Sequence, residues 1–232
     1  MAIAFVQGLL SGNSCVAGTG LTFSGSKTLT AGNDIILVTV SDTPGGVDSV
    51  TDNLGNIYDI VYVSELLVGS PPLIHILRAT NVAGGTLTSQ VVTFGTSTTC
   101  RAGLSCEYSG VADSVSVGGE TNVDNVGSTA PEGHSVAGDS LHLFVVAQVG
   151  PSDAASTPPT GYQSRASEFA SPGGGGDGRG IWLSDRIGVD DNGLKVATLS
   201  ASRDWVTATS NVLTPVFRPA LAGISFDGVT VR

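Results

Sequence analysis

Short apolar or alternating runs, each bounded by turn-forming residues, recur along the whole chain. Alternation is typical of a strand with one buried face, and an unbroken run such as DIILVTVS at 34–41 is typical of a strand buried on both faces. Gly supplies 32 of the 232 residues, whereas the helix formers Glu, Lys and Gln are scarce. The pattern predicts an all-β fold with 34–41 as a central strand.

The other predicted strands follow from the same pattern and are separated by Gly, Asn, Asp, Ser and Pro. A polar, glycine-containing connection is expected over 111–136. The predicted strands cover 3–7, 34–41, 47–51, 57–63, 73–79, 86–94, 101–110, 140–149, 161–169, 180–188, 194–201, 204–210 and 220–231.

The two halves of the chain resemble each other. AGNDIILVTV at 31–40 matches AGDSLHLFVV at 137–146, and IHILRAT near 74–80 matches IWLSDRI near 181–187. Repetition in a constant order indicates a duplicated unit. We therefore predict one antiparallel, jelly-roll-like β-sandwich over 1–232, with pseudo-duplicated halves at about 1–112 and 130–232. Each half is expected to give strands to both sheets, and the last strand to return beside the first.

The charge balance bears on partners and location. A formal net charge of −10 and a pI of about 4.4 disfavour binding to nucleic acid and to anionic membranes. The beginning of the sequence has no basic region before a short apolar stretch, and no apolar segment is long enough to span a bilayer. We expect a chain that is made and folded in a cytoplasm.

The cysteines are Cys15, Cys100 and Cys106, an odd number without a C-x-x-C spacing. In a cytoplasmic protein this favours reduced, part-buried thiols. A bridge between Cys100 and Cys106 is the open alternative.

The stretch VTDNLGNIY at 50–58 is rich in oxygen ligands. One interpretation makes the 48–59 loop a calcium site, with Asp48, Asp52, Asn53 and Asn56 as candidate ligands. The other makes the stretch a turn, because Asp and Asn bond their own backbone and Gly adopts positive φ. The second interpretation, which we prefer, joins VDSVTD and NIYDIVYV as a hairpin.

Catalytic candidates are sparse. His75 and His142 lie in apolar runs at related places in the two halves, and His134 stands apart, so a zinc site is not expected. No nucleophile elbow, phosphate loop or dinucleotide fingerprint is present. We therefore predict a protein that is not an enzyme and carries no cofactor or metal.

Glu107 is the one acidic residue within an apolar, aromatic strand. It is expected to be a structural carboxylate paired with an arginine, for which Arg78, Arg101 and Arg186 are candidates. A glycosidase pair of Glu107 with Asp185 is the alternative, since such enzymes need two carboxylates flanking a cleft.

Tryptophan and tyrosine rings can form platforms on which sugars stack. Trp182 and Trp205 would support glycan binding if their rings were exposed beside Asp and Asn groups, whereas a buried pair would argue against it. Core packing is the default expectation for both.

Four segments together carry a resemblance to a known family: Ala31–Asn33, Asp52–Tyr58, Ala83–Gly85 and Glu107–Val111. In order, AGNDIILVTVSD, VDSVTDNLGNIY, LIHILRATNVAGG and the stretch ending in EYSGV resemble a β-sandwich domain of tailed-phage structural proteins and bacterial surface proteins. We call these four segments the motif segments. The resemblance covers nearly the whole chain, but the motifs are specific for the fold and not for one function.

The resemblance implies a protein of the virion surface that is made in the host cytoplasm. Its expected role is non-enzymatic decoration or cementing of the capsid, and the alternative is an accessory tail or adhesion protein that binds host-surface glycans. The expected partners are the major capsid or tail protein of the same virion, and copies of the chain itself as a trimer. Candidate contact residues are Phe5, Val212, Leu213, Val216 and Phe217.

Overall fold

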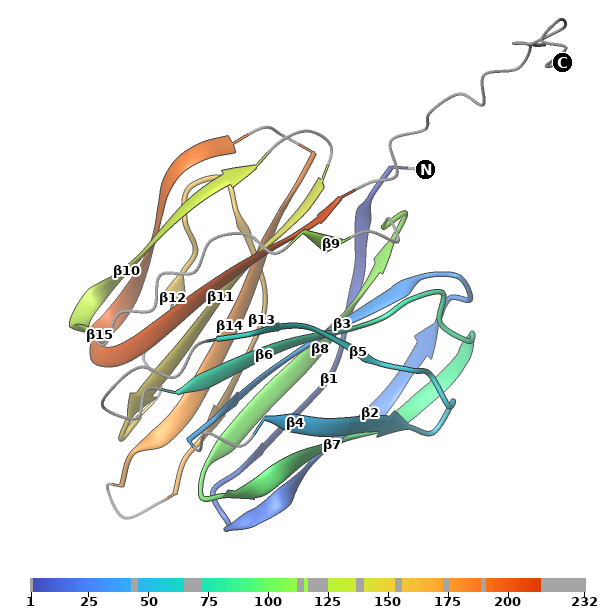
Figure 1. Ribbon diagram of the computed structural model, residues 1–232, viewed down its shortest axis with the longest axis horizontal. Coiled ribbons are helices and arrows are strands. Elements are labelled where there is room, and N and C mark those ends of the chain that lie inside the picture. Colours follow the sequence, from blue (N-terminus) through green and yellow to red (C-terminus); the bar gives the residue numbers. More distant parts are fainter. Residues whose placement is uncertain are drawn as a thin grey trace, which may run out of the picture.

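The computed structural model describes residues 2–42, 46–64, 72–111, 115–116, 125–136, 140–152, 156–172, 176–188 and 191–213. The protein is all-β, and its antiparallel sheets pack against one another as a β-sandwich (Figure 1). The prediction of fold class is confirmed at this level. No helix of the described residues is long and apolar enough to cross a membrane.

Strands from the first half of the chain form two sheets. Sheet A has the order β1-β8-β3-β6-β5, and sheet B has the order β2-β7-β4. Sheet A contains β1 (Ala4–Ser14), β3 (Asp34–Ser41), β5 (Asp59–Val63), β6 (Leu73–Ala79) and β8 (Arg101–Ser109). Sheet B contains β2 (Gly18–Leu29), β4 (Val47–Asp52) and β7 (Gly85–Thr98).

Strands from the second half form sheet C, whose main path is β10-β15-β11-β14-β13. Two short strands, β9 and β12, also pair with β15. The bounds are β9 Val115–Ser116, β10 Asn125–Val136, β11 Ser140–Gly150, β12 Ser156–Thr157, β13 Gln163–Ala170, β14 Gly178–Ile187 and β15 Asp191–Leu213.

Sheet A lies between the other two sheets, and its central strands β3, β6 and β8 are buried on both faces. Every residue of β3 is buried, which confirms the prediction of a central strand. Ile35 and Leu37 belong to the apolar cluster shared with sheet B, whereas Val38 and Val40 belong to the cluster shared with sheet C. Alternate residues of a strand point to opposite faces, so an unbroken apolar run is what this position requires.

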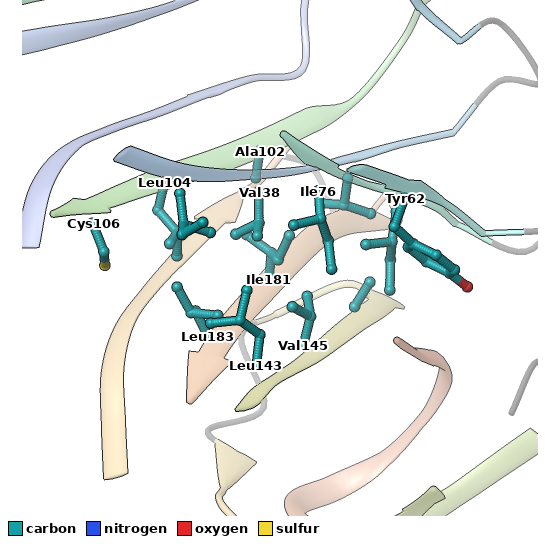
Figure 2. Packing of buried hydrophobic residues seen from close by; sticks show 14 of the residues in the cluster. Val38, Tyr62, Ile76, Ala102, Leu104, Cys106, Leu143, Val145, Ile181 and Leu183 are labelled. Atoms are coloured by element: carbon teal, nitrogen blue, oxygen red, sulfur yellow. The ribbon is translucent and has the colours of Figure 1, made fainter. Parts of the chain in front are cut away.

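The layer between sheets A and C is aliphatic (Figure 2). Val38, Ile76 and Leu104 of sheet A pack against Leu143 and Leu183 of sheet C. A third apolar cluster lies on the far face of β11 and β14, and comprises Phe144, Val146, Tyr162, Trp182, Ala197 and Leu199.

The pairing order of the two halves is similar in part. In the first half, β3 pairs with β8 and β6, while β7 pairs with β2 and β4. In the second, β11 pairs with 204–213 of β15 and with β14. β10 pairs with 191–198 and 203–205 of β15, and β12 pairs with 198–199. The first half divides these strands between two sheets and the second half keeps them in one, so the duplication inferred from sequence stays a prediction. No described sheet combines strands of both halves, which differs from the expectation that each half gives strands to both sheets.

Two expectations about connections are wrong. The segment 111–136 is not a simple connection, because β9 and β10 form within it and pair with β15. The residues of this segment are mainly polar, so the sequence pattern did not predict these strands. The stretch around Asp52 is not a hairpin either, because β4 pairs with β7 in sheet B and β5 pairs with β6 in sheet A. The predicted strand 220–231 lies outside the described residues.

Candidate functional site

Asp52 organises the stretch that connects sheet B to sheet A. Its Oδ1 accepts hydrogen bonds from the backbone N–H groups of Leu54 at 2.9 Å and Asn56 at 3.1 Å. Its Oδ2 accepts from Asn56 Nδ2 at 2.8 Å and from Tyr58 OH at 2.9 Å. Gly55 adopts a φ of 75° within this turn, a conformation that favours glycine. The stretch is therefore a turn held by one carboxylate.

The proposed calcium ligands do not converge. Both oxygens of Asp52 are occupied by donors, as described above, and Asn53 Oδ1 accepts from the backbone of Thr88 at 2.8 Å. Asn56 Oδ1 accepts from the backbone of Ala83 at 2.8 Å. Within the described residues, no group of three or more His, Cys, Asp or Glu side chains is arranged to hold a metal ion.

The other motif segments meet the Asp52 turn at the same end of the sandwich. Gly32 N donates to Val82 O at 3.1 Å, and Val82 N donates to Asn33 O at 2.8 Å. Gly32 has a φ of 84°. Because Ala83 also bonds to Asn56, the segments around 31–33, 52–58 and 83–85 form one hydrogen-bonded assembly.

Glu107 connects the fourth motif segment to this assembly. Its side chain is fully buried. Its carboxylate accepts from Gln7 Nε2 at 2.7 Å, from the backbone N–H of Thr30 at 2.9 Å and from Asn33 Nδ2 at 2.7 Å. A buried carboxylate needs such donors to offset its lost hydration. The structural role was predicted, but these donors are amides and not an arginine.

The candidate arginines have other partners. Arg78 forms a buried ion pair with Asp34. Arg101 donates from Nε to Gly20 O at 2.8 Å and from Nη1 to Val16 O at 2.9 Å. The alternative of a Glu107–Asp185 glycosidase pair is wrong. Glu107 lies opposite Ile35, on the face of sheet A toward sheet B, whereas β14 carries Asp185 on the side of sheet C.

A series of buried hydrogen bonds links the Asp52 turn to the layer between sheets A and B. Ser105 Oγ donates to Gln90 Oε1 at 2.6 Å, and Gln90 Nε2 donates to Tyr58 OH at 2.7 Å. Tyr58 OH in turn donates to Asp52. Burial raises the pKa of Tyr58 far above its usual value, so the phenol stays protonated as this chain of hydrogen bonds requires. Sequence reasoning did not anticipate the chain, because its members are spread over four strands or turns.

A second group of titratable side chains lies between β8 and β14. Arg165 Nη2 forms an ion pair with Asp185 at 2.8 Å, and its guanidinium lies 4.2 Å from the ring centroid of Phe5. Burial, reinforced by the charge of Asp185, raises the pKa of Cys106 to about 12. Burial also raises the pKa of Tyr108 well above its usual value. Burial therefore keeps both groups protonated near neutral pH.

The structure places only one of the predicted contact residues in detail. Phe5 is half-buried and meets Tyr108 edge-on, with ring centroids 5.6 Å apart. Val212 and Leu213 lie in β15, where Val212 pairs with Leu141 and Val115, and Leu213 pairs with Ser140. Val216 and Phe217 lie outside the described residues.

The histidine that stands out is His75, which is fully buried. Its Nε2 accepts from the backbone N–H of Val47 at 3.3 Å, and its ring meets Phe94 edge-on. Nδ1 has no hydrogen-bond partner among the described residues. Burial lowers the pKa of His75 to about 4. His142 is also buried.

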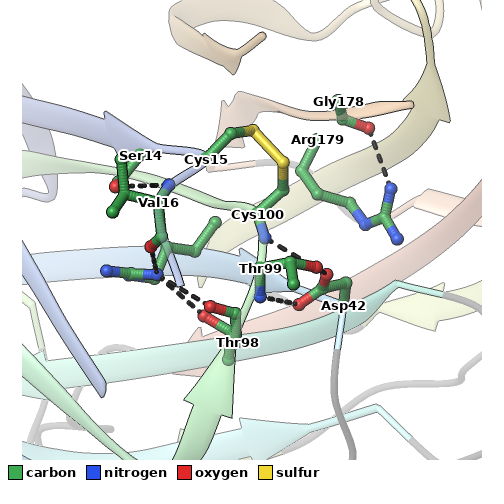
Figure 3. Close-up of a disulfide and its surroundings, with 10 residues drawn as sticks. Ser14, Cys15, Val16, Asp42, Thr98, Thr99, Cys100, Gly178 and Arg179 are labelled. Atoms are coloured by element: carbon green, nitrogen blue, oxygen red, sulfur yellow. Dashed lines mark hydrogen bonds between the residues drawn. A yellow bond between two sulfur atoms is a disulfide. The ribbon is translucent and has the colours of Figure 1, made fainter. Parts of the chain in front are cut away.

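The expectation of three reduced cysteines is wrong. Cys15 and Cys100 form a disulfide, while Cys106 is free and buried. The alternative Cys100–Cys106 bridge is also wrong, because Cys100 is bonded to Cys15. The disulfide joins the β1–β2 and β7–β8 connections (Figure 3). Asp42 accepts from the backbone of Thr99 at 3.0 Å and of Cys100 at 3.1 Å beside it.

Trp182 is not a sugar platform. It is only 7% exposed and packs in the third apolar cluster. The described surface does contain an open cavity of about 450 Å³ beside the Asp52 turn. Its lining is mainly polar and consists of Gly55, Asn56, Ile57, Asp59, Thr80, Asn81 and Ala83.

Comparisons with known proteins add no assignment. No family model, no curated protein and no solved structure matches the chain. The function is therefore argued from the chain's own residues.

Proposed function

We propose that this protein is a non-enzymatic structural protein of a tailed-phage particle, with capsid decoration as its role on the virion surface. The observation that carries the proposal is that polar side chains of the motif segments form hydrogen bonds within the fold. Examples are Asp52, Asn33 and Glu107. The residues that carry the resemblance thus hold the fold together by hydrogen bonds. This use suits a protein whose role is structural.

The titratable clusters of the described residues support a non-enzymatic role. The Glu107 carboxylate is buried among three N–H donors. Cys106 and Tyr108 are buried and stay protonated near neutral pH. A catalytic group must reach its substrate, and these groups are enclosed by the sheets.

The disulfide supports a location outside the reducing cytoplasm. Bridges such as Cys15–Cys100 persist mainly in oxidising surroundings. A chain made in the host cytoplasm would form this bridge once the particle is released. The acidic net charge of −10 also suits an outer surface that does not contact the packaged nucleic acid.

The test is a reconstitution experiment. Heads of the phage that encodes the chain would be prepared without it and mixed with purified protein, and bound copies would be counted by cryo-electron microscopy. We expect saturable binding at symmetry-related positions of the shell. Absence of binding at saturating protein would reject capsid decoration.

Host-surface glycan binding, by an accessory tail or adhesion protein, is the second candidate. The cavity beside Ile57 favours it, because Asp59, Thr80 and Asn81 offer polar groups next to an exposed apolar side chain. A glycan array probed with the intact protein would test this. A glycan signal lost in an Asn81→Ala variant would support the candidate, and an array without signal would reject it.

A further inference from the structure

Strand pairing brings the two cysteines of the disulfide together. β1 and β8 are antiparallel, and their ladder ends with Ser14 opposite Arg101. Cys15 follows Ser14 and Cys100 precedes Arg101, so the next pair in the same register is Cys15 with Cys100. The Cβ atoms of residues directly opposite each other in such a pair lie roughly 4.5 to 5.5 Å apart. The ladder therefore places the two sulfur atoms side by side before any bond joins them.

The guanidinium of Arg101 joins the same two connections without the sulfur atoms. Its Nη1 donates to Val16 O at 2.9 Å, in the β1–β2 connection, and to Thr98 O at 3.1 Å, at the end of β7. Its Nε donates to Gly20 O of β2 at 2.8 Å. Arg101 is only 4% exposed, and hydrogen bonds from a charged donor are stronger than neutral ones. The segments that carry the cysteines are thus held together by contacts that are independent of the bridge.

Asp42, which follows β3, fixes the backbone of Cys100 from a third segment (Figure 3). Its carboxylate accepts from the backbone N–H groups of Thr99 at 3.0 Å and of Cys100 at 3.1 Å, and the Thr99 hydroxyl also donates to it. A carboxylate that receives several donors holds a short connection in one conformation. Because none of these contacts involves sulfur, we expect them to persist in the reduced protein.

The cysteines differ in how easily a dissolved reagent reaches them. Cys15 is half-buried and its neighbour Val16 is 75% exposed, whereas Cys100 is only 4% exposed. Cys106 is fully buried between sheets A and C. Access is one of the factors that decide which sulfur atom takes part in exchange. A small thiol or disulfide therefore meets the sulfur of Cys15 first, and Cys106 is shielded by the two sheets.

We propose that Cys15 and Cys100 are a thiol–disulfide exchange site that opens and closes within the folded protein. In the reduced protein the thiolate of Cys15 attacks one sulfur atom of a small-molecule disulfide such as oxidised glutathione, and one glutathione thiolate leaves. The thiolate of Cys100 then attacks the Cys15 sulfur of this mixed disulfide, and the second glutathione leaves. Two electrons pass from the cysteines to the reagent, and the two protons that the cysteines lose are taken up by the released thiolates.

Such a site adds stability only in oxidising surroundings. The sheets, Arg101 and Asp42 complete the fold, and the bridge then joins two of the connections between sheets A and B. A bridge restricts the unfolded chain, so its closure raises the free energy of unfolding without moving the folded strands. The inference concerns how the bridge forms and does not rest on the proposed function.

The first test uses the intact protein, reduced with dithiothreitol and then freed of it. We expect circular dichroism and urea denaturation to show a folded protein with a cooperative transition. Mixtures of reduced and oxidised glutathione should then close the bridge without changing the far-ultraviolet spectrum. Mass spectrometry would detect the loss of two hydrogen atoms, and peptide mapping would assign the bridge. An unfolded reduced protein would overturn the proposal, as would a folded one that forms no bridge or a bridge that includes Cys106.

The second test measures the part played by Arg101 and Asp42. Arg101→Lys keeps the charge but loses the fork of donors. The equilibrium constant for bridge formation with glutathione should fall about tenfold or more, because the effective concentration of one thiol at the other falls. Asp42→Asn, which keeps one acceptor oxygen, should lower this constant by a smaller factor. Arg165→Lys, at an ion pair on the side of sheet C, is the matched control and should leave it unchanged.

Circular dichroism of each oxidised variant verifies that it is folded. If Arg101→Lys does not fold, Asp42→Asn decides the question. Equilibrium constants equal to that of the wild type in the folded variants of Arg101 and Asp42 would overturn the proposal that these residues hold the reduced cysteines in place.

Discussion

The two faces of sheet A are held in different ways. Toward sheet B an apolar cluster that includes Ile35 and Leu37 is accompanied by directional polar contacts. These are made by Glu107, by the hydrogen bonds from Ser105 to Asp52 and by the ring of His75. Toward sheet C the contacts are mainly aliphatic, with Leu143 and Leu183 among the central residues. The first half interleaves its strands between sheets A and B, so many crossings need to be fixed in place. The buried hydrogen bonds help to fix those crossings. Aliphatic packing predominates where sheet C meets sheet A.

The disulfide joins two of the connections between sheets A and B. Replacing both Cys15 and Cys100 by serine should lower the free energy of unfolding by about 4 kcal/mol, because 85 residues separate the cysteines and the bridge restricts the unfolded chain. Urea denaturation would measure the loss. Cys106→Ser, at the free thiol, is the control for thiol removal. Equal stability of the double variant and the wild type would contradict a formed bridge.

The aliphatic layer should respond to lost volume. Leu143→Ala removes a side chain that is 1% exposed and should cost about 3 kcal/mol, from lost burial and the cavity that remains. Its effect should be independent of pH. Val16→Ala on the surface should change stability by less than about 0.5 kcal/mol. A cost for Leu143→Ala as small as that of the control would mean that sheet C is not packed on sheet A.

His75 should make the sheet B side sensitive to acid. Its folded-state pKa of about 4 lies below the unfolded value of about 6.5, so the unfolded state binds the proton first as pH falls. The resulting stability is complete above the unfolded pKa and declines between about pH 6.5 and 4. From pH 7.5 to 5 the loss should be about 2 kcal/mol.

Unfolding free energies of the wild type and His75→Gln across this range would measure the effect. His75→Gln should flatten the profile, and His142→Gln, at the other buried histidine, serves as the comparison. An unchanged slope in His75→Gln would assign the acid sensitivity to other groups.

The smallest expected effect concerns the polar chain. Tyr58→Phe removes the hydroxyl between Gln90 and Asp52 and should cost about 1 kcal/mol. A double-mutant cycle with Gln90→Leu would show coupling of about 0.5 kcal/mol or more if the chain acts as a unit. Strict additivity would show that its members act separately.

Much of the architecture could be predicted from the sequence, because strand patterns are local. The unbroken apolar run of β3 required burial on both faces, and every residue of the strand is buried. The turn at Asp52 was also predictable, since Asp, Asn and Gly carry their preference in their own side chains.

The predictions that failed concerned contacts between residues far apart in the sequence. The strand that follows the Asp52 turn pairs in another sheet, and nothing local distinguishes such a crossing from a hairpin. The Cys15–Cys100 bridge spans 85 residues and depends on two connections that meet only in the fold. The amide partners of Glu107 come from distant segments. β10 was missed because its residues are mainly polar.

The measurement that tests the central claim most directly is the stability of Glu107→Gln. The claim is that the motif segments act as ties of the fold. Replacing one acceptor oxygen by an NH₂ group would oppose donors that converge on the carboxylate from Gln7, Thr30 and Asn33. We predict a loss of about 2 kcal/mol or more in the free energy of unfolding. A stability unchanged within about 0.5 kcal/mol would contradict the claim and would indicate that Glu107 serves another task.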